Sequence, residues 1–289
     1  MWYQIIALLI WSSSFIAAKF SYSMLDPYML VQLRLLIAAL IVLPACVRYA
    51  PRVAKQHWPL LCLVTFANYV AVLLLQLVGL QHTSAASAIT LIGLEPLLMV
   101  FLGHFFLGDR AQWHHWVCGS LAFIGVAVLI AGGAEQTGND QISLWGCMLV
   151  LLAGVVFALA VRPTKRLVQQ IGASTYTSVS LVVSVFMCLP FTLLFSHTET
   201  MQWTWTGVAG LLYLGIACSW LAFKLWIKGT PTVDANMSGL LTALEPIFGV
   251  FLAVLLLGER ITWISWVGIA LVLIATIGAA MWPRWVANK

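Results

Sequence analysis

A duplicated motif constrains this chain more than any other feature of its sequence. Leu-Glu-Pro occupies 94–96 and 244–246, and a Gly-acid-Arg tripeptide occupies 108–110 and 258–260, both at an offset of 150 positions. Further identities at this offset are Val100/Val250, Phe101/Phe251, Leu102/Leu252, Leu107/Leu257, Trp113/Trp263 and Trp116/Trp266. A repeat of this size indicates that the chain consists of two related halves.

The composition indicates a membrane protein. The 289 residues are 62% hydrophobic and only 8% charged, and the mean hydropathy is +1.00. A soluble domain has about 25% charged residues. The net charge of +5 is small and spread over connecting segments, which argues against a nucleic-acid-binding surface.

Apolar runs between polar or Pro/Gly breaks predict ten transmembrane helices. The first run has no Lys or Arg before it and is about 20 residues long, which favours a spanning helix over a signal peptide. The predicted spans are 2–21, 28–48, 58–78, 83–106 and 113–132, then 142–163, 174–195, 204–225, 233–257 and 263–282. We therefore expect a five-helix repeat over 1–132, a linker at 133–141 and a second five-helix repeat over 142–289.

The distribution of Lys and Arg predicts the orientation. With a cytoplasmic N-terminus the far side holds only Lys19 and Arg260, and Arg34 lies inside a span. The cytoplasmic side then holds Arg48, Arg52, Lys55, Arg110, Arg162, Lys165, Arg166, Lys224, Lys228, Arg284 and Lys289. Both termini are therefore predicted to be cytoplasmic.

Each predicted half has an odd number of helices, so the halves insert with opposite topology. A second echo supports this: at an offset of 146, Trp11 and Lys19 correspond to Phe157 and Lys165, and Leu43-Pro44 matches Leu189-Pro190. Inverted repeats are the architecture of many secondary transporters, whose substrate site lies near the bilayer midplane. The predicted fold is therefore an all-α integral membrane protein with ten transmembrane helices in two inverted five-helix repeats.

Several motifs resemble one known family. Trp11, Ser12 and Phe15 form a Trp-Ser-x-x-Phe motif, Arg34 lies in the second helix, and the Glu-Pro helices end in Gly-acid-Arg. With the five-helix repeats, this pattern resembles the EamA family of the drug/metabolite transporter superfamily, over essentially the whole chain. The resemblance implies export of amino acids, their derivatives or drug-like compounds across the cytoplasmic membrane.

Two intramembrane acids, Glu95 and Glu245, are the first candidates for substrate binding or coupling. Each precedes a proline, which removes a helical hydrogen bond and leaves carbonyls near the acid. Helical spacing places Ser238 and Thr242 on the same side of the ninth helix as Glu245. Desolvation disfavours a charged carboxyl, so either acid can bind a proton on one side and release it on the other. The alternative is a structural role that stabilises both broken helices.

Residues without a counterpart in the other half are candidates for recognising the cargo. Arg34 can pair with a carboxylate, snorkel outward or pair with Asp26. At the 146 offset it matches Ser180, which argues against a purely structural role. In the third helix, Asn68 with Tyr69, and Gln76 on the same face as Asn68, either line a cavity or hydrogen-bond between helices. The candidates of this kind are therefore Arg34, Asn68, Tyr69 and Gln76.

Aromatic and basic residues complete the candidate set. Trp11 and Phe157 are equivalent in the first and sixth helices, so they either pack structurally or form gates. In the eighth helix, Trp220 and Lys224 lie one turn apart, and Lys224 either snorkels or faces the pore.

The remaining motifs bear on the class of function. The sequence has no phosphate-binding Gly-x-x-x-x-Gly-Lys-Ser/Thr loop, no metal-ligand spacing and no catalytic motif, so we expect neither a cofactor, a metal nor an enzyme. The predicted function is a secondary transporter exporting a small molecule by alternating access, as a monomer or homodimer surrounded by lipid. Proton antiport and facilitated diffusion both remain open, and the alternatives are a channel or receptor and, further off, a membrane-embedded enzyme.

Overall fold

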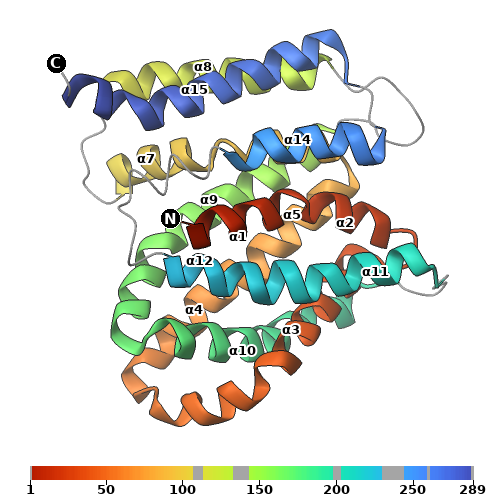
Figure 1. The fold of residues 1–289 in the computed structure, drawn as a ribbon, viewed down its shortest axis with the longest axis vertical. Coiled ribbons are helices and arrows are strands. Elements are labelled where there is room, and N and C mark those ends of the chain that lie inside the picture. The colour runs from red at the N-terminus through yellow and green to blue at the C-terminus, as the bar shows by residue number, and fades with distance from the viewer. Residues whose placement is uncertain are drawn as a thin grey trace.

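The computed structural model describes residues 2–106, 113–132, 143–197, 203–229, 244–258 and 261–287, and these residues are organised as helices (Figure 1). Within these described ranges, six helices are long and apolar enough to cross a membrane, namely 2–21, 27–52, 55–81, 144–171, 173–195 and 205–229. Shorter apolar helices accompany them. The predicted class, an all-α membrane protein, is confirmed, whereas the number of spans stays a prediction.

The chain order of the helices is as follows. Up to residue 132 the elements are α1 (Trp2–Ser12), α2 (Ser14–Ser21), α3 (Pro27–Tyr49), η1 (Ala50–Arg52), η2 (Lys55–His57), α4 (Trp58–Thr65), η3 (Phe66–Ala71), α5 (Val72–Gln81), α6 (Ala85–Ile92), α7 (Glu95–Phe106) and α8 (Trp113–Gly132). After the linker they are α9 (Leu144–Ile171), α10 (Ala173–Phe195), α11 (Trp205–Tyr213), η4 (Leu214–Ala222), α12 (Phe223–Gly229), α14 (Leu244–Leu257) and α15 (Trp263–Ala287).

Polar side chains begin several of these helices by capping their first backbone N–H groups. Asp26 accepts hydrogen bonds from the N–H groups of Tyr28 and Met29, at 2.8 and 3.0 Å, at the start of α3. Ser84 caps α6 and Thr204 caps α11 in the same way. Such caps satisfy donors that have no partner within the helix, so short polar residues fix where the apolar segments begin.

One helix is longer than its predicted span. The sequence placed the end of the sixth span at residue 163, whereas α9 continues through Pro163 to Ile171. The added turns carry Lys165 and Arg166, which are both exposed. The prediction equated the end of the apolar run with the end of the helix, but a helix can project beyond the apolar layer, where its charged residues are solvated.

The main helix pairs join segments that are distant in sequence. α3 packs on α10, α8 packs on α15, and α6 packs on α14. In each pair one helix precedes the linker and the other follows it. α8 and α15 lie together along one edge of the molecule in Figure 1, and both chain ends lie toward the same side. The segments before and after the linker therefore pack against each other through these pairs.

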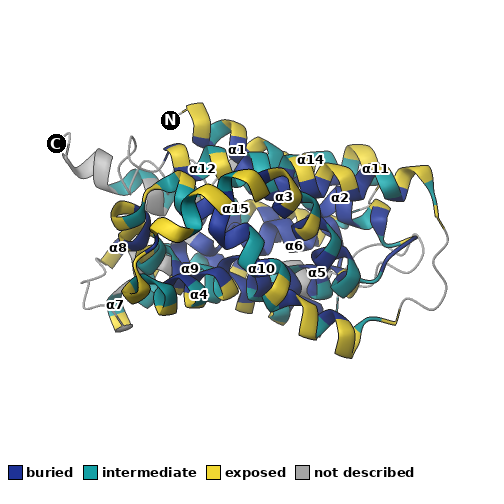
Figure 2. Cartoon of the chain, turned by 90° about the horizontal axis from the view of Figure 1, so that it is seen from below, coloured by how far each residue is buried: buried dark blue, intermediate teal, exposed yellow. Residues whose placement is uncertain are grey.

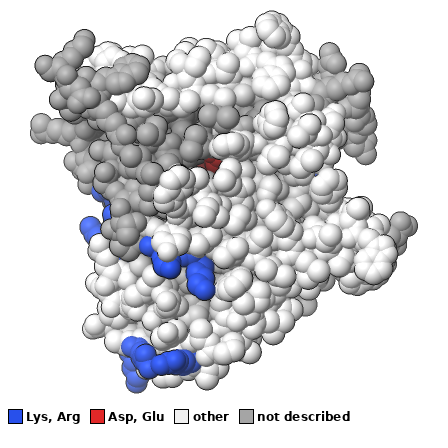
Figure 3. Space-filling view, viewed as in Figure 1, with Lys and Arg blue, Asp and Glu red and all other residues white. Residues whose placement is uncertain are grey.

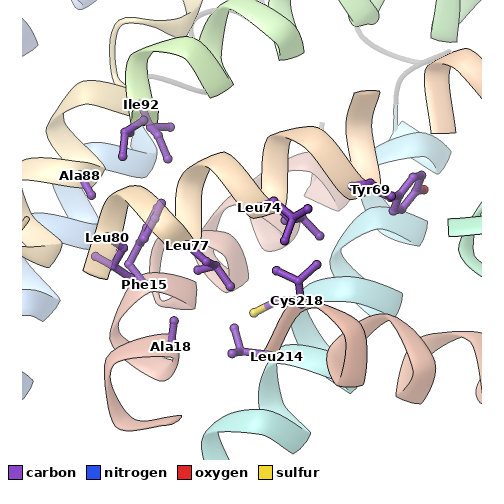
Figure 4. Packing of buried hydrophobic residues seen from close by; sticks show 14 of the residues in the cluster. Phe15, Ala18, Tyr69, Leu74, Leu77, Leu80, Ala88, Ile92, Leu214 and Cys218 are labelled. Carbon is purple, nitrogen blue, oxygen red and sulfur yellow. The ribbon is translucent and has the colours of Figure 1, made fainter. Parts of the chain in front are cut away.

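The interior and the exterior of the bundle are both apolar. Figure 2 shows buried residues along the middle of the bundle and exposed residues on its outer helix faces. In Figure 4 Leu74 and Leu77 of α5 point toward Cys218 and Leu214 of η4. Large apolar side chains also face outward, and Leu193 is 75% exposed. An outer surface of this kind suits contact with lipid.

α5 and α9 approach closely because glycines face each other. A Cβ atom added to Gly79 would lie 2.8 Å from the Gly146 carbonyl oxygen, and one added to Gly146 would lie 2.7 Å from the Gly79 oxygen. Small residues allow such approach between helices in a membrane, where packing drives association. This contact fixes the spacing between the third helix and the first helix after the linker.

We expect Gly79→Ala to lower the melting temperature of the detergent-solubilised protein. The added methyl group must push a backbone oxygen away, at a cost of about 1–3 kcal/mol, which exceeds the gain of about 1 kcal/mol from better helix propensity. Gly278→Ala is the matched control, since its Cβ would meet only the Cys118 sulfur at 3.5 Å. Equal melting temperatures for the two variants would contradict the close contact.

Candidate functional site

The helix break at the first Glu-Pro motif lies ahead of the proline. α6 ends at Ile92, a turn follows, and α7 begins at Glu95. Pro96 therefore occupies the first turn of α7, where a missing N–H removes no intrahelical bond. The expectation that Pro96 lies inside a continuing helix is wrong, because the helix is interrupted at residues 93–94. Free carbonyls beside the acid stay a prediction.

The second motif lies on α14. Glu245 and Pro246 belong to the first described turn of that helix, Leu244–Leu257. For Glu95, whose helix starts after the turn, a carboxyl group at a helix N-terminus interacts favourably with the unpaired N–H groups and the helix dipole. That position serves structure and can also present the carboxyl to a ligand.

The two motifs meet. A Cβ atom on Gly93, in the turn before Glu95, would lie 3.1 Å from Cγ of Pro246. Glu95 is buried and Glu245 is half-buried, and each lies within two residues of this contact. In Figure 3 a small acidic spot is visible between other atoms in the upper half of the face, above the Lys and Arg residues at the lower left. The folded chain therefore brings the duplicated acids together.

Arg34 is inside the protein. It is 3% exposed, and its Nε donates a hydrogen bond to Oγ of Ser219, 2.8 Å away. Arg34 belongs to α3 and Ser219 to η4, so the bond joins helices from opposite sides of the linker. Its burial rules out outward snorkelling. Asp26 caps the start of α3 and accepts a hydrogen bond from Ser196.

η3 is a π-helical turn within the third helix, and it positions Asn68 and Tyr69. Nδ2 of Asn68 lies 2.7 Å from the Val64 oxygen, 2.9 Å from Oγ1 of Thr164 and 3.5 Å from the Tyr176 hydroxyl. The bonds to Thr164 and Tyr176 cross to α9 and α10. The prediction left interhelical bonding and cavity lining open for Asn68, and the observed contacts are interhelical.

η4 is a second π-helical segment, and it lies in the helix that follows α10. η3 starts at 66 and η4 at 214, and 214 − 66 gives 148, between the two offsets of the sequence repeat. Neither segment is predicted from the sequence. A π turn arises from one extra residue in the helical hydrogen-bond pattern, and no residue type marks it. Such turns are frequent at functional sites.

An aromatic cluster lies between the two π-helical segments. The Phe223 ring lies 4.9 Å from the Trp11 ring and 4.7 Å from the Tyr69 ring, measured between centroids. Trp11 also donates from Nε1 to the carbonyl oxygen of Cys218, 3.0 Å away. Tyr69 is fully buried, and its hydroxyl has no hydrogen-bond partner among the described residues. Trp11 and Tyr69 are therefore brought together, which the sequence spacing did not predict.

The other predicted site residues are more dispersed. Gln76 is half-buried on α5 and Phe157 is half-buried on α9. Among the described rings Trp11 contacts Phe223 and Trp226, so it forms no aromatic pair with Phe157 there. Lys224 is exposed, with Nζ 5.2 Å above the Trp220 ring, as the snorkelling interpretation expects. Ser238 and Thr242 lie outside the described residues.

No cluster of His, Cys, Asp and Glu suited to a metal ion occurs within the described ranges. The six cysteines are free thiols. His114 stacks on Trp282, with ring centroids 5.6 Å apart.

The sequence profile of the EamA-like transporter family matches residues 1–131 and 144–281. The chain belongs to the EamA-like transporter family. An uncharacterized transporter of Haemophilus influenzae is 54% identical over 143 residues, which are 50% of this chain and 84% of the relative. The uncharacterized transporter YdeK of Bacillus subtilis is 28% identical over 95% of this chain and 94% of its own length.

A solved crystal structure shares the fold. It aligns with a TM-score of 0.69 at 19% identity, over 98% of this chain and 97% of the other. Together with the apolar helices, membership of the EamA-like family makes this chain a multi-pass membrane transporter. As for any membrane transporter, its binding partners include a small-molecule substrate and lipid.

Adjacent residues of η3 give opposite predictions for stability. Tyr69→Phe removes a buried hydroxyl that has no partner in the described chain, so we expect an equal or higher melting temperature. Asn68→Ala removes a donor from the Thr164 and Tyr176 hydroxyls, which we expect to cost about 1–3 kcal/mol. Thermal unfolding in detergent measures both. A clear destabilisation by Tyr69→Phe would show that its hydroxyl has a partner in the folded protein.

Proposed function

We propose that this EamA-like protein is a secondary transporter that exports a small metabolite across the bacterial cytoplasmic membrane by alternating access. The observation that carries the proposal is the meeting of the two Glu-Pro motifs, where Gly93 approaches Pro246. Helices that begin inside a membrane bundle are tolerated where protein or a water-filled cavity satisfies their ends. Transporters place substrate sites at such breaks, near the midplane between repeats.

The proposed architecture is ten transmembrane helices in two inverted five-helix repeats, over 1–132 and 142–289. Three observations support it: the family profile matches two separate segments, 1–131 and 144–281; the sequence repeats at offsets of 146 and 150; and a π-helical segment occurs in the third helix of each proposed repeat. Two similar halves of opposite topology can exchange conformations, which produces inward-open and outward-open states.

Glu95 and Glu245 are the proposed coupling residues. They flank the contact between Gly93 and Pro246 in an apolar interior, where mutual repulsion and desolvation disfavour two simultaneous negative charges. One proton held by the pair would therefore be exchanged as the site opens to either side. The sequence lacks a nucleotide-binding loop, so proton antiport and facilitated diffusion are the two modes to be distinguished.

Efflux from proteoliposomes tests the function and its coupling. With purified protein and a loaded panel of amino acids and related metabolites, we expect saturable efflux of at least one class and acceleration by a pH gradient. Glu95→Gln and Glu245→Gln should each slow pH-driven efflux by about tenfold, which corresponds to about 1.4 kcal/mol in the barrier.

Glu135→Gln, in the polar linker, is the matched control and should leave efflux unchanged. Non-saturating flux would indicate a channel, and no flux for any class by folded protein would refute the exporter. If both site variants keep the wild-type rate and pH dependence, the coupling role fails while the transport function stands.

The proposed topology places both termini in the cytoplasm and the linker outside. Lys and Arg are far more numerous on the proposed cytoplasmic side, with Lys19 and Arg260 alone on the other. Green fluorescent protein fused after Lys289 should therefore fluoresce, and alkaline phosphatase inserted after Thr137 should be active. The reverse pattern at either position would show that the proposed orientation is wrong.

A further inference from the structure

Two hydrogen bonds join corresponding helices of the two proposed repeats, and only one of them involves a charged residue. In both, the second helix of one repeat contacts the third helix of the other. Arg34 of α3 donates to Ser219 of η4, 2.8 Å away, and Thr65 of α4 donates to Ser180 of α10, 2.9 Å away. Ser180 is also the residue that matches Arg34 at the sequence offset of 146, since 34 + 146 is 180.

The neutral pair shows what this helix contact needs structurally. Thr65 and Ser180 are both 0% exposed, and two hydroxyl groups suffice to join their helices. Ser219 is equally buried, and Arg34 is 3% exposed. The guanidinium of Arg34 therefore adds a buried positive charge at a contact that the other half makes without one. Charged residues inside a membrane are costly and mark functional sites.

The hydrogen bonds of Arg34 leave part of its guanidinium available. Within the described ranges its side chain donates only from Nε, and no ion pair with an acid is found. Arginine stays protonated in proteins and offers five N–H donors in a planar fork. With Nε held by Ser219, the two terminal amino groups of the fork keep a fixed direction, and their charge calls for an anion.

The surroundings limit the size and charge of that anion. One guanidinium neutralises a monoanion, whereas a phosphate dianion would leave a net negative charge in a low-dielectric interior, which is costly. Cys218 precedes Ser219 in η4. The Cys218 carbonyl accepts the Trp11 hydrogen bond. The residue that holds the cationic fork is therefore next in sequence to one that contacts the aromatic cluster.

We propose that Arg34, oriented by Ser219, is the subsite that binds a carboxylate group of the transported substrate. Carboxylate geometry matches the guanidinium fork and permits two parallel charge-assisted hydrogen bonds. The proposal rests on the transport function above and narrows its substrate class to small organic molecules that carry one carboxylate. The apolar part of such a molecule would lie toward Trp11 and Phe223.

Binding to purified full-length protein tests the subsite, with acids compared against their own amides. The probes are 3-phenylpropionate, L-phenylalanine and L-leucine, each paired with the corresponding carboxamide. We expect the wild type to bind at least one acid about tenfold or more tightly than its amide, as a charge-assisted hydrogen bond permits. Arg34→Met should bring the acid-to-amide ratio of affinities to about one. Arg34→Lys should retain part of the preference for the acid, because the charge persists without the fork.

The neutral contact supplies the matched control. The double variant Thr65→Val with Ser180→Ala changes the equivalent helix contact and should keep the wild-type acid-to-amide ratio. Ser219→Ala should lower the ratio, because it frees the guanidinium without removing its charge. Gel filtration in detergent establishes that each variant is folded before binding is measured.

Several results would overturn the proposal. These are an acid-to-amide ratio of one in the wild type for every pair, an unchanged ratio in Arg34→Met, or an equal loss of ratio in the control variant. Asp234 belongs to the predicted ninth span and lies outside the described residues. It is the alternative partner of Arg34 that the experiment must eliminate. If Arg34→Met and Asp234→Asn each abolish efflux but their combination restores it, Arg34 is half of a structural ion pair.

The binding and efflux measurements separate the two proposals. An Arg34-dependent preference for acids, without efflux of any probe, would support the subsite and refute the proposed export function. Efflux of cargo that lacks a carboxylate, unaffected by Arg34→Met, would retain the transporter and refute the subsite.

Discussion

The requirement that every backbone polar group in a membrane find a partner governs this structure. Continuous helices meet it by themselves, but the turn between α6 and α7 does not, so it must be enclosed by protein. Its neighbour is Pro246, from the equivalent motif of the other segment. Each Glu-Pro motif thus helps to enclose the other, and this mutual burial places two acids in the interior of the bundle.

The same scaffold carries different chemistry in its two segments. α3 and α10 pack together and each bonds to a helix across the linker, but one bond uses Arg34 and the other uses Ser180. Duplicated features such as the acids serve the fold in both places. Unmatched features impose a cost in only one place, and a buried guanidinium is the most costly of them. Cargo recognition is therefore best sought where the pseudo-symmetry fails.

Particular residues show how far the sequence could be read. Apolar runs predicted α10 within about a residue, because lipid imposes a minimum apolar length. The end of α9 was missed, since its last turns lie beyond the apolar run that defines a span. The helix break at Gly93 was expected at the proline instead. A proline indicates that the helical hydrogen-bond pattern is interrupted, but not on which side of it the helix ends. The π-helical segments have no residue signature at all.

The sequence by itself determined the membrane class, the repeat and the short set of polar residues within apolar runs, because each follows from composition or spacing along the chain. Only the tertiary structure decided which of those residues meet. The Glu95 motif approaches the Glu245 motif, Arg34 bonds to Ser219, and Trp11 joins the Tyr69 cluster through Phe223. These contacts depend on how helices from the two segments pack and on the extra residue in each π turn. Local periodicity carries no information about either.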